Sequence, residues 1–220
     1  MISAQEEEVQ KKLIDREQIL EAFHFRHACK IFDENKKISD EDINFILEAG
    51  RLSPSSFGME HWEFLVIENQ KIKNSLKPFC WNQNQIDSCS HLVAIVAKTK
   101  LVEAGGEYRK KMLARKGLSQ DLLELYLKKY DDYISKMNNE QVKFWAEKQC
   151  YIAGANMATT ASMIAIDSCF IEGFERDRVS EILSLGNDVS LAYLLSFGYR
   201  KNEQSKKIRL EIDEVVRFIK

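Results

Sequence analysis

The chain has 220 residues, of which 45% are hydrophobic and 30% are charged, and its formal net charge is −2. This composition is typical of a soluble globular protein, and the charge gives no reason to expect nucleic acid or an anionic membrane as the main partner. The first eight residues have no segment typical of a secretory signal. The longest uncharged stretch, residues 150–166, is short for a membrane span. We expect one cytoplasmic domain over residues 1–220.

The five cysteines are scattered and form no C-x-x-C pair, which argues against a disulfide framework or a zinc site. His24, His27 and Cys29 lie close together, but no second cluster completes a tetrahedral site. We therefore expect no metal.

The first predicted elements are two helices. Residues 5–25 have the apolar spacing of an amphipathic helix. A second helix is expected to begin at Ser39, which forms a motif like a capping box with Asp42.

The second helix is expected to end in a polar loop. Pro54 lacks a backbone N–H and disfavours the α conformation of Ser53. Ser55, Ser56 and Gly58 follow, and their N–H and hydroxyl groups could bind a polar heterocycle or a phosphate. The alternative is a simple connection between a helix and a strand.

Strands are predicted at 62–67, 91–97 and 189–199 from their branched, aromatic and apolar residues. The continuous apolar run at 91–97 indicates a central strand that is buried on both faces. A short helix is expected over 71–76, and 168–174 is interpreted as a short strand or a loop.

The remaining predicted elements are helical. Residues 101–118 have mixed, glycine-bearing composition and are interpreted as a mobile excursion, and apolar residues over 123–134 then follow helical spacing. Together, residues of about 101–140 are expected to form a mobile helical excursion. A nearly charge-free helix is predicted over 144–166, and a helix that is apolar on all sides must be covered on all sides. It is therefore either a core helix or one covered by a second subunit. With a further helix over 177–185, the fold class is α+β.

Several motifs with known chemistry are absent from the sequence. No G-x-G-x-x-G follows a strand, and neither a P-loop nor a G-x-S-x-G motif occurs. What remains is a series of polar clusters beside apolar elements. The basic clusters would suit a phosphate, although each cluster alone is typical of a solvated surface.

Five short motifs follow one another within residues 18–209, and each alone is unspecific. They are Arg26-His-Ala-Cys-Lys30, Ser53-Pro-Ser-Ser-x-Gly-x-x-x-Trp62, Asn82 before Ser90-His-Leu-Val, Asp167-Ser-Cys-Phe-Ile-Glu-Gly173, and Lys207-Ile-Arg209. Together and in this order they resemble the FMN-dependent, NAD(P)H-using nitroreductases. Within that family the chain looks like the oxygen-insensitive nitroreductase/flavin reductase branch of epsilonproteobacterial type.

The resemblance implies a homodimer with a central, mostly antiparallel β-sheet surrounded by helices and a long buried helix at the dimer interface. It implies FMN at the interface and NAD(P)H as the electron donor. Arg26, Lys30, Lys207 and Arg209 would hold the FMN phosphate and nearby polar atoms, and His27 would add a contact.

The resemblance also implies positions around the flavin ring. Asn82 would reach the isoalloxazine edge, and the backbone of Glu172 and Gly173 would approach flavin N5. Glu172 is the nearest candidate for a catalytic role, but no protein nucleophile is required. Ser55, Ser56 and Gly58 would come from the other subunit. The cofactor-binding positions expected in this way are Arg26, His27, Ala28, Lys30, Ser55, Ser56, Gly58, Asn82, Gln85, Phe170, Ile171, Glu172, Gly173, Lys207 and Arg209.

The sequence departs from the commoner family pattern at several of these positions. Ala28 stands where serine is usual, Gly58 where asparagine is common, the pair Glu60-His61 where Gln-Pro is common, and Phe170 where proline is frequent. Gln85 stands where many relatives have lysine. A cation there would stabilise the anionic reduced flavin, so its loss is expected to lower the reduction potential.

The expected activity is transfer of electrons from NAD(P)H to nitroaromatic or nitroheterocyclic compounds or quinones by a ping-pong mechanism. One alternative is mainly a flavin reductase. Another is a flavin redox sensor without turnover, with exposed cysteines such as Cys29 as the reporter. A third is a helical dimerisation protein whose polar clusters are surface features. Nicotinamide preference is left open, with Lys98, Lys100, Arg109 and Arg200 as candidate readers of a 2′-phosphate.

Overall fold

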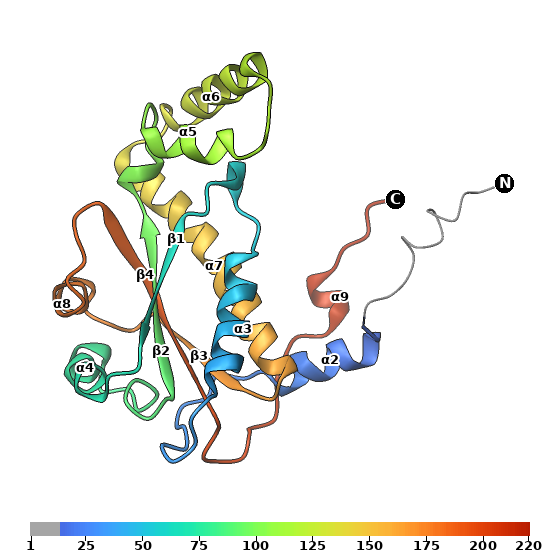
Figure 1. The fold of residues 1–220 in the computed structure, drawn as a ribbon. Coiled ribbons are helices and arrows are strands. Elements are labelled where there is room, and N and C mark those ends of the chain that lie inside the picture. The colour runs from blue at the N-terminus through green and yellow to red at the C-terminus, as the bar shows by residue number, and fades with distance from the viewer. Residues whose placement is uncertain (1–13) are drawn as a thin grey trace.

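A computed structural model describes residues 14–220 of the chain (Figure 1). Its first helix is α2 (Arg16–Phe25), and the part of the predicted helix over residues 5–13 lies outside the described residues. Within the described range, no helix is long and apolar enough to cross a membrane.

The central sheet of the described chain has four strands: β1 (Trp62–Ile67), β2 (His91–Lys98), β3 (Asp167–Ile171) and β4 (Val189–Gly198). Their order is β1-β2-β4-β3, and each neighbouring pair is antiparallel. This confirms the predicted α+β class with an antiparallel sheet. The segment interpreted as a strand or a loop is a strand in its first part.

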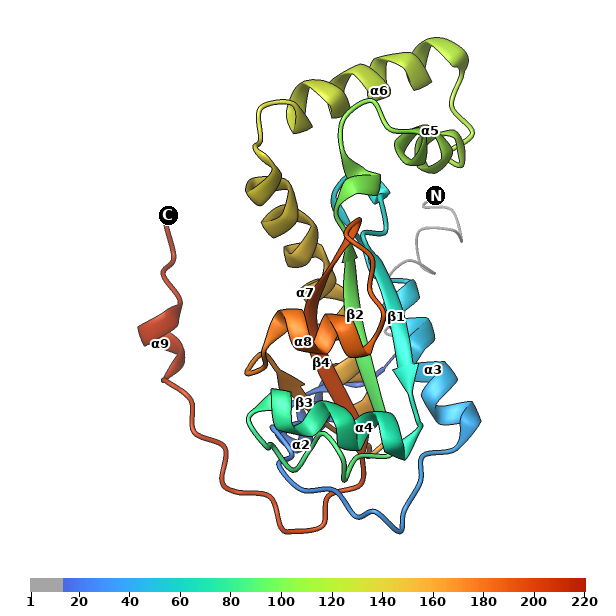
Figure 2. The same cartoon turned by 90° about the vertical axis from the view of Figure 1, so that its left-hand side faces the viewer.

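Helices cover both faces of the sheet (Figures 1 and 2). The long helix α7 (Asn139–Met163) packs against all four strands, with α3 (Asp40–Arg51) beside it. The other face is covered by α4 (Gln70–Leu76) and α8 (Arg176–Ile182). Side chains of β2 alternate between the two resulting cores, as the two-residue period of a strand requires. Val93, Ile95 and Ala97 belong to the core with α7, whereas Leu92, Ala94 and Val96 belong to the core with α4 and α8.

The predicted start of α3 is confirmed. The Ser39 hydroxyl accepts a hydrogen bond from the Asp42 N–H at 3.1 Å and donates one to the Asp42 carboxylate at 2.8 Å. The aspartate therefore bonds to the capping hydroxyl and not to the Ser39 backbone as in a standard capping box.

The long helix α7 begins five residues before the predicted start at residue 144. Asn138 and Gln141 form a reciprocal capping box, which satisfies backbone donors at the start of the helix. The apolar pattern alone does not reveal this start. The helix is also not covered on all sides within one chain. Phe144, Ile152 and Met163 are exposed on its outer face, so the core-helix alternative is wrong for the chain alone, and coverage by a second subunit stays a prediction.

The segment between β2 and α7 contains α5 (Glu107–Ala114) and α6 (Gln120–Ile134), which project beyond one end of the sheet (Figures 1 and 2). The predicted helical excursion over about 101–140 contains both helices, but no bounds were predicted for α5. Arg109 and Asp131 join the two helices through a bidentate ion pair with contacts of 2.6 and 2.7 Å. The Tyr108 hydroxyl donates to the Met59 carbonyl at 2.9 Å, which attaches the excursion to the loop before β1.

After β4 the chain continues without regular structure, except for the short helix α9 (Ile212–Val215). This tail extends away from the sheet (Figure 2). Its apolar side chains Ile208, Leu210, Phe218 and Ile219 are exposed.

Candidate functional site

Basic side chains from the two ends of the described chain meet at one cavity. The cavity has a volume of about 360 Å³ and is lined by Arg26, His27, Ala28 and residues 204–209. The Lys207 ammonium donates to the Arg26 carbonyl. Burial, together with the charges of Arg26 and Arg209, lowers the pKa of Lys207. Of the described residues that line the cavity, none is a carboxylate. The cavity therefore offers uncompensated positive charge to an anion.

Backbone pairing brings the motif Arg26–Lys30 and the motif Asp167–Gly173 together. Ala28 forms a parallel bridge with Ser168 at the start of β3, and the Cys29 N–H donates to the Ser168 carbonyl at 3.1 Å. Lys30 does not line the Arg26 cavity. It lines a neighbouring cavity of about 270 Å³, and its Nζ lies 3.6 Å from Cys169 Sγ.

His27 is one of the residues that line the basic cavity. Its Nδ1 is 3.4 Å from Oδ1 of the buried Asp167. Burial lowers the pKa of His27 and outweighs the opposing effect of Asp167. The ring is therefore mainly neutral near pH 7 and can contribute hydrogen bonds rather than charge.

The segment around Asn82 and the motif Asp167–Gly173 meet beyond the end of β3. Gln83 Nε2 donates to the Gly173 carbonyl at 2.8 Å. Trp81 and Asn82 are both left-handed, with φ of 53° and 52°, and the indole covers Gly173. A Cβ at residue 173 would lie 2.4 Å from the Trp81 ring, so the packing requires glycine. Trp81 is nevertheless 72% exposed.

Trp81 and Gln83 are site residues that sequence reasoning missed. The available signal was an aromatic residue directly before Asn82 in an otherwise polar segment. Gln85 is only 2% exposed and donates to Gln83 Oε1 at 2.9 Å, so it supports the loop from within. Phe170 lies beside Tyr193 with ring centroids 5.3 Å apart. Ile171 is buried in the core with α4 and α8, and Glu172 is exposed.

The serine loop, residues 53–58, follows the C-terminal end of α3, whereas α2 lies toward the other end of that helix (Figure 1). The Ser56 N–H donates to Gln149 Oε1 on α7 at 2.9 Å, and Ser55 Oγ accepts from the Glu60 N–H at 2.9 Å. Gly58 has a φ of 70°, which favours glycine. Within the described part of one chain, no hydrogen bond or ion pair joins this loop to the basic cavity.

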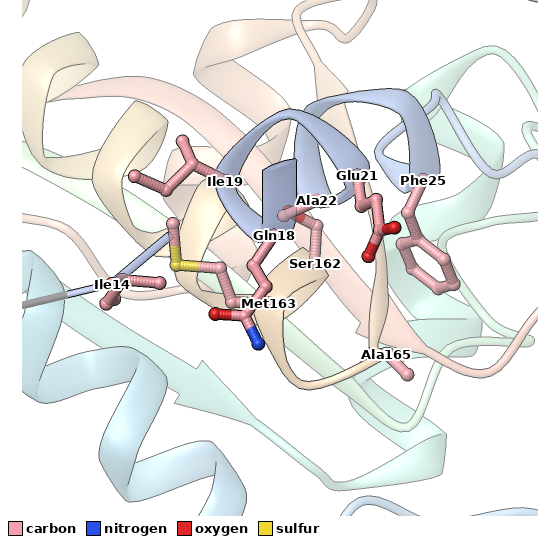
Figure 3. A pocket seen from close by; sticks show the side chains of 9 residues that line it. All are labelled: Ile14, Gln18, Ile19, Glu21, Ala22, Phe25, Ser162, Met163 and Ala165. Atoms are coloured by element: carbon pink, nitrogen blue, oxygen red, sulfur yellow. The ribbon is translucent and has the colours of Figure 1, made fainter. Parts of the chain in front are cut away.

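A larger cavity, of about 500 Å³, lies between α2 and the end of α7 and has different chemistry (Figure 3). Its lining is mostly apolar, with one carboxylate, one amide and one hydroxyl. The residues are Ile14, Gln18, Ile19, Glu21, Ala22, Phe25, Ser162, Met163 and Ala165. It brings together none of the sequence motifs.

All five cysteines are buried. Burial raises the pKa of Cys29, Cys80, Cys89 and Cys150 to about 12, which keeps these thiols protonated and unreactive at neutral pH. The expectation that exposed cysteines act as a redox reporter is therefore wrong. No group of three or more His, Cys, Asp or Glu side chains in residues 14–220 could hold a metal ion.

The candidate readers of a nicotinamide 2′-phosphate are engaged in other contacts. Arg109 pairs with Asp131, Arg200 with Asp167, and Lys100 with Asp188. Lys98 Nζ lies 3.1 Å from the Tyr108 hydroxyl and 3.3 Å from the Glu60 carbonyl oxygen.

Comparison with known proteins gives a consistent result. The model of the "Nitroreductase family" matches residues 24–199. A Haemophilus influenzae protein named "Putative NAD(P)H nitroreductase" is 43% identical over 217 residues, covering 94% of this chain and 98% of that relative. YfkO of Bacillus subtilis, which bears the same description, is 41% identical over 215 residues, covering 92% and 97%.

Solved structures share the fold. YdfN from Bacillus subtilis superposes with a TM-score of 0.84 at 16% identity, covering 93% of this chain and all of that chain. A protein from Exiguobacterium sibiricum, solved in complex with FMN, gives a TM-score of 0.79 at 23% identity, covering 95% and 99%. The family match and the sequence identities above 40% show that this chain belongs to the nitroreductase family.

Proposed function

We propose that the protein is an FMN-dependent oxidoreductase of the oxygen-insensitive nitroreductase/flavin reductase branch. It transfers electrons from NAD(P)H to nitroaromatic or nitroheterocyclic compounds or to quinones in a ping-pong cycle. The single observation that carries the proposal is the carboxylate-free cavity in which Arg26, Lys207 and Arg209 converge. Such a set of donors fits the phosphate of a mononucleotide through charge-assisted hydrogen bonds.

The position of this cavity relative to Gly173 supports a flavin mononucleotide in particular. β3 begins beside Ala28 and ends just before Glu172. Its four residue steps span about 13 Å at 3.3 Å per step. An extended ligand could therefore have its phosphate at the start of β3 and its ring beyond the end. There, Gly173 provides a backbone without a side chain, and the exposed Trp81 provides a flat apolar surface.

When bound, FMN would supply hydride acceptance at N5 and delivery of electrons to the second substrate. The residues of this chain would bind, orient and shield. The cations would fix the phosphate end, Asn82 would contribute an amide at the ring edge, and Trp81 would limit access of water to one face. No side-chain nucleophile is needed, and Glu172 remains the nearest candidate for a catalytic role.

We also propose a homodimer in which Ser55, Ser56 and Gly58 complete the partner's site. Two observations support it. The outer face of α7 presents an uncovered apolar stripe, and the tail after β4 exposes several large apolar side chains. Such surfaces are typical of protein interfaces. Light scattering after size-exclusion chromatography should give twice the mass of the 25.6 kDa chain. A monomer that binds FMN would refute this part of the proposal.

The function is tested by the visible spectrum of protein purified without added flavin. A yellow protein is expected to bleach on anaerobic addition of NADH or NADPH and to recolour with a nitroaromatic compound. Steady-state rates with free flavin and with the nitro compound would distinguish a nitroreductase from mainly a flavin reductase. A colourless protein that does not take up FMN would overturn the proposal.

A further inference from the structure

An ion pair between the buried Asp167 and the partly exposed Arg200 lies next to the basic cavity without lining it. The Asp167 carboxylate is at the start of β3, and Arg200 follows the end of β4. Asp167 Oδ2 accepts from the Arg200 backbone N–H at 2.9 Å and from Nε at 3.0 Å. Arg200 Nη2 lies 2.8 Å from Asp167 Oδ1 as an ionic contact. The guanidinium also stacks over the Phe25 ring, 4.1 Å from its centroid.

Arg200 joins the two chain segments that carry the cations of the cavity. Its Nη1 donates to Gln204 Oε1 at 2.8 Å, and Gln204 Nε2 donates to the His24 carbonyl at 3.0 Å. Phe25 and His24 directly precede Arg26, whereas Gln204 leads to Lys207. The segments are about 180 positions apart in sequence, and the arginine contacts fix their relative position.

The pair also compensates the negative charge of Asp167 beside the cavity. Asp167 would otherwise be a buried, uncompensated carboxylate 3.4 Å from His27 and close to the phosphate-binding cations. Its pairing with Arg200 neutralises this charge, so that Arg26, Lys207 and Arg209 keep their full attraction for an anion. A planar fork suits this role, because lysine cannot make the bidentate contact and the stacking together.

We propose that Arg200 and Asp167 are positioning residues for the phosphate half of the cofactor site. They set the preference for a phosphorylated flavin without touching it. This inference rests on the proposed function, because it assumes that the basic cavity holds the FMN phosphate.

The test compares FMN with riboflavin, which differ only in the phosphate. Flavin fluorescence titration of the flavin-stripped full chain gives both dissociation constants. For Arg200→Met we expect the FMN Kd to rise about tenfold or more, by analogy with the loss of affinity when residues that orient metal ligands are removed. The riboflavin Kd should stay nearly unchanged, because riboflavin has no phosphate for these residues to position. Arg200→Lys should recover only part of the FMN preference.

Arg109→Met is the matched control, because Arg109 makes the same bidentate contact with Asp131 but lies outside the cavity. Its ratio of riboflavin to FMN dissociation constants should equal that of the wild type. If Arg200→Met fails to fold, the double variant Asp167→Asn/Arg200→Met removes both charges and avoids a lone buried carboxylate. It should show the same loss of FMN preference.

The possible results distinguish the positioning role of Arg200 from the proposed function of the protein. A folded Arg200 variant or double variant with the wild-type ratio would overturn the positioning role. So would an equal fall of the ratio in Arg109→Met, since that would indicate general loosening of the fold. A wild-type protein that binds neither flavin would instead refute the proposed function.

Discussion

Acid should destabilise the protein through His61, which is 0% exposed in the core beneath α7. Among the described residues, neither ring nitrogen of His61 has a hydrogen-bond partner. The ring packs at a right angle against Trp145, with centroids 4.4 Å apart. Burial, with a smaller effect from the charge of Lys98, lowers the pKa of His61 from 6.5 to about 3.

The unfolded state binds the proton first. Its imidazole is protonated as the pH falls below 6.5, whereas the folded imidazole stays neutral until about pH 3. The contribution to stability is therefore complete above pH 6.5 and is lost between pH 6.5 and 3. At 1.36 kcal/mol per pKa unit, the loss is about 2 kcal/mol at pH 5 and about 5 kcal/mol at pH 3.

Urea unfolding of the wild type and of His61→Phe, at pH 7.5 and 5.0 and one protein concentration, measures this effect. Phenylalanine keeps a ring against Trp145 but cannot be protonated. His27 and His91, whose pKa values are also lowered by burial, are present in both proteins and cancel in the difference. The stability of the variant relative to the wild type should grow by about 2 kcal/mol from pH 7.5 to 5.0. A difference that does not change with pH would refute a buried neutral imidazole.

Three further changes test other parts of the molecule. Lys207→Ala should weaken FMN binding by about tenfold or more, since it removes a charge-assisted contact, and should leave riboflavin binding nearly unchanged; equal losses for both flavins would contradict a phosphate role. Gly173→Ala should displace Trp81, shift the protein's fluorescence and lower kcat/KM by about tenfold, and wild-type values for both would contradict the close contact. Asp131→Asn, which breaks the pair with Arg109, should lower the free energy of unfolding by about 1–2 kcal/mol, measured by urea titration against Glu107→Gln as an exposed control.

The sequence predicted those elements whose signal is local. The strand over 62–67 was predicted with its observed bounds, because its branched and aromatic residues are followed directly by turn residues. The run at 91–97 is a central strand, as its apolar continuity indicated. By contrast, the bounds of α5 were not predicted within the helical excursion. Its short segment mixes charged and apolar residues, and it is held by the Arg109–Asp131 pair, a contact that no local pattern reveals. The early start of α7 depends on the Asn138 cap.

The candidate site could be predicted only in part. The residues alone suggested phosphate-binding clusters, and only the family resemblance joined Arg26 to Lys207 across the chain. Their common cavity depends on the pairing of Ala28 with Ser168 and on the packing of the tail after β4. The contact of Trp81 with Gly173 is tertiary, so it was not visible either. The proposed roles of the serine loop stay predictions, because one chain does not bring that loop to the cavity.

The exposure of Trp81 gives the protein a built-in optical probe of its site. The chain has three tryptophans, all within the described residues, and the other two, Trp62 and Trp145, are buried in the core. A collisional quencher such as acrylamide would therefore act almost entirely on the indole that covers Gly173. Occupancy of the site by any flat ring should shield that indole from the quencher. Binding of colourless acceptors or of nicotinamide could thus be followed without labels and without turnover.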